Sequence, residues 1–159
     1  MYRRKPSKAA VYAIAIGGTL LIGAISGLIG IKGFKNYAAL DKPPLSPPAW
    51  LFPVAWSILY VLMGISAARV YLAGTPYTKV AMTVYCAQLL VNALWTPIFF
   101  ALELRLVAFV WLLLLIVLVV MMIAKFKKAD TLAGNLQFPY LVWLLFAAYL
   151  NMGAFILNK

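Results

Sequence analysis

Residues 42–60 read KPPLSPPAWLFPVAWSILY, in which five prolines lead into a long apolar segment. Proline fixes φ and lacks an N–H, so paired prolines favour an extended connection followed by the first turn of a helix. Trp56 and Tyr60 then lie four residues apart, on one helical face. This pattern predicts a rigid entry to an apolar pocket for a flat ligand. The alternative is an interfacial belt of Trp50 and Phe52 with ordinary helix packing behind it.

The composition extends this interpretation to the whole chain. Of the 159 residues, 66% are hydrophobic and 11% are charged, which excludes a soluble globular domain. Five apolar stretches are long enough to cross a hydrocarbon core of about 30 Å. They are residues 9–31, 49–72, 79–101, 106–124 and 133–157. We therefore predict an all-α fold, a single integral membrane domain over residues 1–159 with five transmembrane helices. A lid loop at residues 32–48 is the longest connection.

The net charge of +11 has two possible meanings. The basic residues lie at segment ends rather than on one folded face, which favours topology signals over nucleic-acid binding. With five spans, nine basic residues share one side: Arg3, Arg4, Lys5, Lys8, Arg69, Lys79, Lys125, Lys127 and Lys128. The other side has five: Lys32, Lys35, Lys42, Arg105 and Lys159. The excess predicts a cytoplasmic N-terminus and an external C-terminus.

The third span carries a polar and aromatic stripe. Its members are spaced by three, four, three and four residues: Tyr85, Gln88, Asn92, Trp95 and Phe99. Amides inside a bilayer are costly unless paired, so the stripe faces protein, ligand or water rather than lipid. Hydrogen bonding between helices and a ligand pocket both explain the two amides. The fifth span has a similar stripe of Tyr140, Trp143, Ala147 and then Leu150 or Asn151. The small Ala147 either leaves room for a ligand or permits close packing.

Two further features bear on helix packing. Gly23 and Gly27 form a GxxxG pattern, which lets another helix approach closely in lipid, either within the chain or from a second copy. Pro97 removes the hydrogen bond to the carbonyl of Ala93 and predicts a kink just beyond Trp95.

The chemistry available to the chain is restricted. It contains no histidine, and its three acids, Asp41, Glu103 and Asp130, lie near segment ends. A proton relay at mid-membrane, a nucleophilic triad and a histidine ligand for metal or haem are therefore excluded. We expect no metal and no cofactor. Binding of a flat apolar molecule through aromatic faces and amide hydrogen bonds remains.

Three motifs carry a family resemblance. They are PPAWLFPVAWSILY at residues 47–60, AQLLVNALWTPIFF at 87–100 and PYLVW at 139–143. In this order they resemble the TspO family, the tryptophan-rich sensory or translocator proteins. The resemblance implies a five-helix bundle, a homodimer, a bacterial inner-membrane location, and a pocket closed by the connection between the first two spans. It also implies porphyrins such as protoporphyrin IX as ligands.

The resemblance also implies roles for individual residues. The carried-over pocket positions are Trp56, Tyr60, Asn92, Trp95, Trp143 and Ala147. With the two stripes, the candidate ligand-binding residues are Trp56, Tyr60, Tyr85, Gln88, Asn92, Trp95, Phe99, Tyr140, Trp143 and Ala147. Trp56 and Trp143 match tryptophans tied to light-dependent porphyrin breakdown in some bacterial members. The function is thus open between a porphyrin receptor, sensor or carrier, a porphyrin-degrading enzyme with these two tryptophans as catalytic residues, and a transporter of small hydrophobic molecules. Asn36 and Leu45 stand where many bacterial members have tryptophan, which makes the expected lid less aromatic.

Overall fold

The computed structural model describes residues 6–158, apart from the side chains of residues 32, 34, 35 and 38. This part of the chain is helical and contains no strand. In chain order the elements are α1 (Lys8–Ala38), α2 (Leu51–Ala73), α3 (Thr78–Thr96), the π-helical η1 (Pro97–Ala101), α4 (Arg105–Ala129), α5 (Thr131–Asn135) and α6 (Phe138–Leu157). Five helical stretches are long and apolar enough to cross a membrane. The all-α fold with five transmembrane helices is confirmed.

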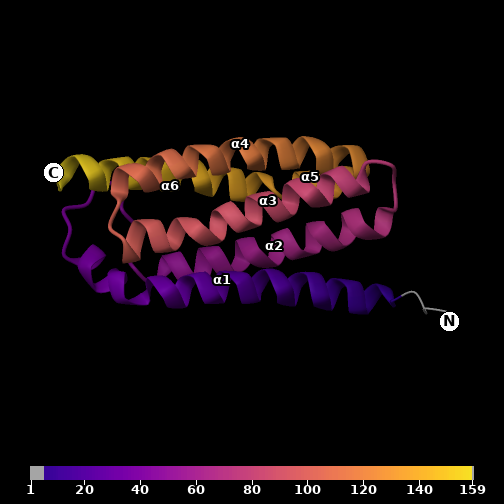
Figure 1. Cartoon of the computed structure of the whole chain (residues 1–159), viewed down its shortest axis with the longest axis horizontal. Coiled ribbons are helices and arrows are strands. Elements are labelled where there is room, and N and C mark those ends of the chain that lie inside the picture. The colour runs from indigo at the N-terminus through magenta and orange to yellow at the C-terminus, as the bar shows by residue number, and fades with distance from the viewer. Residues whose placement is uncertain (1–5, 159) are drawn as a thin grey trace.

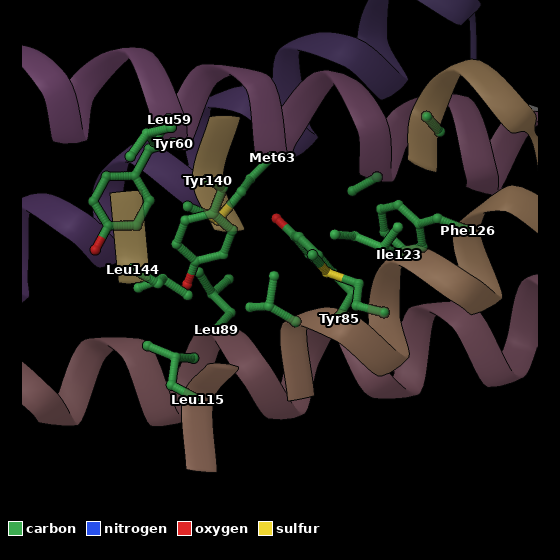
Figure 2. Packing of buried hydrophobic residues seen from close by; sticks show 14 of the residues in the cluster. Leu59, Tyr60, Met63, Tyr85, Leu89, Leu115, Ile123, Phe126, Tyr140 and Leu144 are labelled. Carbon is green, nitrogen blue, oxygen red and sulfur yellow. The ribbon is translucent and has the colours of Figure 1, made fainter. Parts of the chain in front are cut away.

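The long helices run side by side along one axis, and the two ends of the chain lie at opposite ends of the bundle (Figure 1). Helix α1 packs against α2, α3 against α4, and α4 against α6. Figure 2 shows the core between them, where Tyr60 and Met63 of α2 meet Leu89 of α3 and Tyr140 of α6. Because α6 has its main backbone contact with α4, large side chains fill the space between α6 and α2.

Helix α1 is longer than predicted, so the lid runs over residues 39–50 rather than 32–48. The Ala39 N–H bonds to the carbonyls of Asn36 and Tyr37, which continues the helical pattern to this point. The paired prolines from Pro43 onward then prevent further helix. Gly33 also lies directly against the Phe100 carbonyl, where a Cβ would collide with backbone. This close approach holds the extended end of α1 on η1.

The last predicted span is divided in two. Asp130 caps α5 by accepting a hydrogen bond of 2.8 Å from the Ala133 N–H. The chain then turns at Leu136 and Gln137 before α6 begins. Asp130 also pairs with Arg69 of α2 at 2.8 Å. Burial raises the pKa of the Asp130 carboxyl, but the hydrogen bonds from Arg69 and Ala133 outweigh burial and hold that pKa below its ordinary value. The ion pair that joins α2 to the start of α5 is therefore charged at neutral pH.

At Pro97 the α-helical part of α3 ends and a π-helical segment begins. Beyond it the helix widens into η1, where the Leu102 N–H bonds to the Pro97 carbonyl at 2.9 Å. The Ser26 hydroxyl of α1 donates to the Ala93 carbonyl at 2.6 Å. A serine on a neighbouring helix thus satisfies the carbonyl that proline leaves without its helical partner.

Of the two glycines in the GxxxG pattern of α1, Gly23 packs closely against another helix of the same chain. A Cβ at this position would collide with the Tyr60 ring of α2, whereas one at Gly27 would meet nothing within 4 Å. The GxxxG pattern therefore does not form a continuous contact with one neighbour. Of the charges counted for topology, Arg3, Arg4, Lys5 and Lys159 lie outside the described residues.

Candidate functional site

A chain of buried hydrogen bonds joins three helices at the centre of the bundle. The Tyr60 hydroxyl of α2 donates to Asn92 Oδ1 of α3 at 2.7 Å. Asn92 Nδ2 donates to the Tyr140 hydroxyl of α6 at 2.6 Å, and that hydroxyl donates to Gln88 Oε1 at 3.1 Å. Gln88 Nε2 lies 3.8 Å from the Met63 sulfur. The amides of the α3 stripe are thus paired with tyrosines across helices. A role for them in contacting a ligand stays a prediction.

Aromatic rings cover this hydrogen-bonded group on the side toward the lid. Trp56 lies one turn before Tyr60, with ring centres 5.6 Å apart, and 6.2 Å from the ring of Tyr140. Phe52, one turn earlier, meets Trp143 at 6.1 Å. Helices α2 and α6 therefore contact each other through two layers of aromatic side chains. Such faces bind flat apolar molecules by stacking and edge contacts.

Two indole N–H groups beside these layers have no hydrogen-bond partner. Trp95 Nε1 and Trp143 Nε1 are buried and unpaired among the described residues. Both rings pack against the main core cluster, and Trp95 also stacks on Phe99 at 5.2 Å. In contrast, Trp111 Nε1 donates to the Val91 carbonyl at 2.8 Å. Buried tryptophan N–H groups usually find a partner, so the two unpaired donors are available to a ligand.

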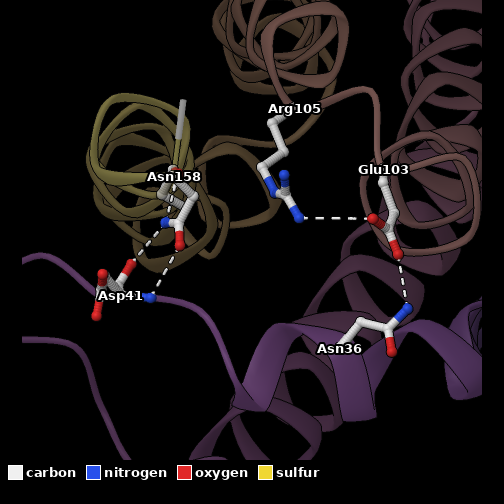
Figure 3. Close-up of polar contacts among 6 residues, drawn as sticks. Asn36, Asp41, Glu103, Arg105 and Asn158 are labelled. Atoms are coloured by element: carbon white, nitrogen blue, oxygen red, sulfur yellow. Dashed lines mark hydrogen bonds and ion pairs between the residues drawn. The ribbon is translucent and has the colours of Figure 1, made fainter.

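The lid is fastened to the C-terminal half of α6. The Tyr149 hydroxyl donates to the Pro44 carbonyl at 2.7 Å. Asn158 Nδ2 donates to the Asp41 carbonyl at 2.9 Å, and the Asp41 N–H donates to Asn158 Oδ1 at 3.0 Å (Figure 3). The Pro43 ring fills the space beside Gly153, where a Cβ would lie 2.5 Å from Pro43 Cγ. These contacts hold the lid over the end of the bundle at which the aromatic layers lie.

The two positions that depart from the resemblance, Asn36 near the end of α1 and Leu45 in the lid, make other contacts or none. Asn36 Nδ2 donates to Glu103 Oε1 at 2.6 Å, and Glu103 pairs with Arg105 at 3.7 Å (Figure 3). Leu45 is 83% exposed, and its φ of 67° is unusual for a residue with a side chain. Neither side chain reaches the aromatic layers. The ring of Tyr37, at the end of α1, does so by meeting Phe52 at 6.3 Å.

The other predicted site residues are distributed around this centre. Ala147 is buried in the main core cluster with Tyr140. Tyr85 is turned toward the opposite end of the bundle, where its hydroxyl pairs with Thr19 at 2.5 Å and its ring lies beside Phe126 (Figure 2). The structure therefore brings together Trp56, Tyr60, Gln88, Asn92 and Tyr140, and packs Trp95 and Trp143 against the same core cluster. Phe99 lies in a second cluster and stacks on Trp95. Tyr85 lies in the main cluster, but its hydroxyl is bonded to Thr19 and not to the central amides.

Two further residues were not among the candidate ligand-binding residues selected from the sequence. Phe52 of α2 joins α1 and α6 through its contacts with Tyr37 and Trp143, and its position four residues before Trp56 was the available signal. Asn151 is 1% exposed, and both of its amide atoms are unpaired among the described residues. It lies four residues after Ala147, on the stripe already noted for α6. No group of three or more potential metal ligands occurs in the part of the chain that the structure describes.

Comparison with known proteins gives a consistent result. The sequence model of the TspO/MBR family matches residues 11–157. A tryptophan-rich sensory protein of Cereibacter sphaeroides is 37% identical over 147 residues, covering 92% of this chain and 89% of its own length. Protein CrtK of Rhodobacter capsulatus is 41% identical over 124 residues, covering 77% of this chain and 78% of its own. The human translocator protein is 36% identical over 123 residues, covering 76% and 73%.

Proposed function

This chain belongs to the TspO/MBR family of membrane proteins, and on that premise we propose that it is a receptor or carrier for a porphyrin-type ligand. The ligand binds between α2, α3 and α6, against Trp56, Trp95 and Trp143. The observation that carries the proposal is the pair of buried indole N–H groups, Trp95 Nε1 and Trp143 Nε1, which lack partners among the described residues. Relatives named sensory protein and translocator protein support a role in recognising or moving a small molecule.

A porphyrin matches the chemistry of these side chains. Its macrocycle is flat and apolar and suits the rings of Trp56 and Trp143, while its carboxylate oxygens accept hydrogen bonds from indole N–H groups. An unsatisfied buried donor costs about 1–3 kcal/mol, so a ligand acceptor that pairs with it gains affinity without displacing an existing bond. The Tyr60–Asn92–Tyr140 hydrogen bonds hold the wall behind the ligand in one geometry.

A titration of the purified protein with protoporphyrin IX tests the proposal. Trp95→Phe and Trp143→Phe each retain an aromatic ring and remove the N–H. We expect each variant to lose about two- to tenfold in affinity, the value of one net hydrogen bond. Trp111→Phe is the matched control, because its N–H already bonds to the Val91 carbonyl. Equal affinities in all four proteins would refute the assignment of the two indoles.

The same samples separate binding from catalysis. A stoichiometric complex whose pigment spectrum is unchanged in light supports a receptor or carrier. Bleaching over many turnovers in light, lost in Trp56→Phe and Trp143→Phe, would instead support the porphyrin-degrading enzyme. Directional flux of the pigment into liposomes would support a transporter.

A further inference from the structure

A groove of about 660 Å³ opens on the outer surface of the bundle where α2 turns into α3. Its lining comes from the end of α2, the turn and the first part of α3: Tyr71, Gly74, Thr75, Pro76, Thr78, Lys79, Met82, Thr83 and Cys86. The groove lies at the end of the bundle at which the chain begins, away from the lid (Figure 1). It is therefore separate from the site proposed for the porphyrin.

The groove changes from polar to apolar along its length. Thr75 and Lys79 lie at its outer end, whereas Met82 and Cys86 lie deeper along α3. The eight residue steps from Thr78 to Cys86 span about 12 Å of helix. That length reaches from the headgroup region into the hydrocarbon region of one leaflet. A ligand that fills the groove has a polar head and an apolar tail.

The hydrogen-bond donors at the outer end are suited to an anion. The Thr78 and Thr83 hydroxyls donate to the carbonyls of Val70 and Lys79, so they are occupied. The Thr75 hydroxyl lies 3.4 Å from the Thr78 oxygen and donates to it, because the Thr78 proton is already used for Val70. This leaves the Lys79 ammonium as the donor at the mouth of the groove. A second ammonium is nearby, since Lys128 Nζ of α4 lies 5.8 Å from the centre of the Tyr77 ring, next to the turn.

The positive charge of this end of the bundle also favours an anionic ligand. Among the described residues, the acid at this end is Asp130, which is paired with Arg69. The lysines described at the same end are Lys8, Lys79, Lys125, Lys127 and Lys128. Basic sites at the ends of transmembrane helices bind anionic lipid headgroups.

We propose that this groove binds one anionic phospholipid. The phosphate lies at the Lys79 ammonium, and an acyl chain follows Met82 and Cys86 toward the centre of the bilayer. A second copy of the chain is the competing occupant.

The chain carries its own reporter of this site. Cys86 is its single cysteine and is exposed in the groove, so a bimane label attaches there without other substitutions. The labelled full-length protein is reconstituted in phosphatidylcholine vesicles that contain a minor share of brominated phosphatidylglycerol or, in parallel, brominated phosphatidylcholine. Bromine quenches bimane at short range, so the ratio of quenching measures lipid preference at Cys86. We expect about a fivefold preference for phosphatidylglycerol, the effect of one lysine near an anionic headgroup.

Two variants with the same change of charge locate the preference. Lys79→Gln is expected to bring the ratio close to one, whereas Lys8→Gln, outside the groove, leaves it unchanged. Added inorganic phosphate is expected to leave the quenching unchanged, because it lacks the acyl chain. Equal quenching by both lipids, or a preference that persists in Lys79→Gln, would overturn the proposal. Protection of the label from both lipids, together with disulfide cross-linking of Cys86 between chains of the unlabelled protein, would assign the groove to a second copy instead.

Discussion

Asn92 is the residue on which the centre of the bundle depends most. Its carbonyl accepts from Tyr60 and its amino group donates to Tyr140, so one side chain joins α2, α3 and α6. In hydrocarbon no water can replace these bonds, and the pairing fixes the rotation of the three helices relative to one another. Both tyrosines also carry rings of the aromatic layers, so the same side chain fixes the wall of the proposed site.

Replacement of Asn92 by Leu keeps the volume similar and removes both bonds. The Tyr60 hydroxyl then loses its partner and the Tyr140 hydroxyl loses a donor, and we expect a loss of about 1–2 kcal/mol of stability. Thermal unfolding in detergent, followed by circular dichroism, measures the change. Tyr60→Phe is the control with one bond removed, and it should cost less than Asn92→Leu. Equal melting temperatures for Asn92→Leu and the original protein would show that the network does not stabilise the bundle.

The sequence predicts the members of this site better than their partners. The spacing of three and four residues on α3 correctly places Gln88 and Asn92 inside the bundle, because polar groups must avoid lipid. The same spacing includes Tyr85, which turns to Thr19 instead. The periodicity of α3 predicts which of its residues share a face, but the partner of each residue depends on the helix that packs against it at that height in the bundle. For Tyr85 the partners come from α1 and α4, and the spacing along α3 gives no information about them.

At the scale of elements, the widened end of α3 depends on a residue of another helix. Pro97 leaves the Ala93 carbonyl without its usual donor, and Ser26 of α1 supplies one at 2.6 Å. The sequence predicts the freed carbonyl, but not that α1 satisfies it. Similarly, the end of α1 at Ala38 depends on local capping and on contact with η1, neither of which has a hydropathy signal. The boundary of the lid was for this reason wrong by several residues.

Replacement of Ser26 by Ala tests this contact between helices. The variant leaves the Ala93 carbonyl unsatisfied in hydrocarbon, and we expect a loss of about 1–3 kcal/mol of stability. Ser57→Ala is a matched control, since the exposed Ser57 hydroxyl bonds only to the Pro53 carbonyl of its own helix at 2.8 Å. Its melting temperature should stay close to that of the original protein. A similar decrease in melting temperature for both variants would show that the effect comes from the loss of any serine hydroxyl and not from the loss of the bond to the Ala93 carbonyl.

At the scale of the whole molecule, the two ends of the bundle differ in charge. Around the lid, two acids partly offset the basic residues, and one of them, Glu103, pairs with Arg105. The basic residues there are Lys32, Lys35, Lys42 and Arg105, and the acids are Asp41 and Glu103. At the opposite end the lysines exceed the single acid, Asp130. The placement of the turns in the structure thus agrees with the division of charges on which the predicted orientation rests. The homodimer implied by the resemblance stays a prediction, and the groove experiment includes it as an outcome.

The orientation of the chain in the membrane is the last prediction. The positive-inside rule puts the lysine-rich end in the cytoplasm and the lid outside. In a Cys86→Ser background, single cysteines at Leu102 and Asn135 report on the two ends. Leu102 is 61% exposed near the lid, and Asn135 is exposed at the last residue of α5. An impermeant maleimide applied to intact cells should label Leu102→Cys and leave Asn135→Cys unlabelled until the membrane is opened. Detergent-solubilised samples, in which both thiols must react, are the control for accessibility. Labelling of Asn135→Cys alone in intact cells would show that the orientation is opposite to the predicted one. The proposed phospholipid groove would then lie in the outer leaflet.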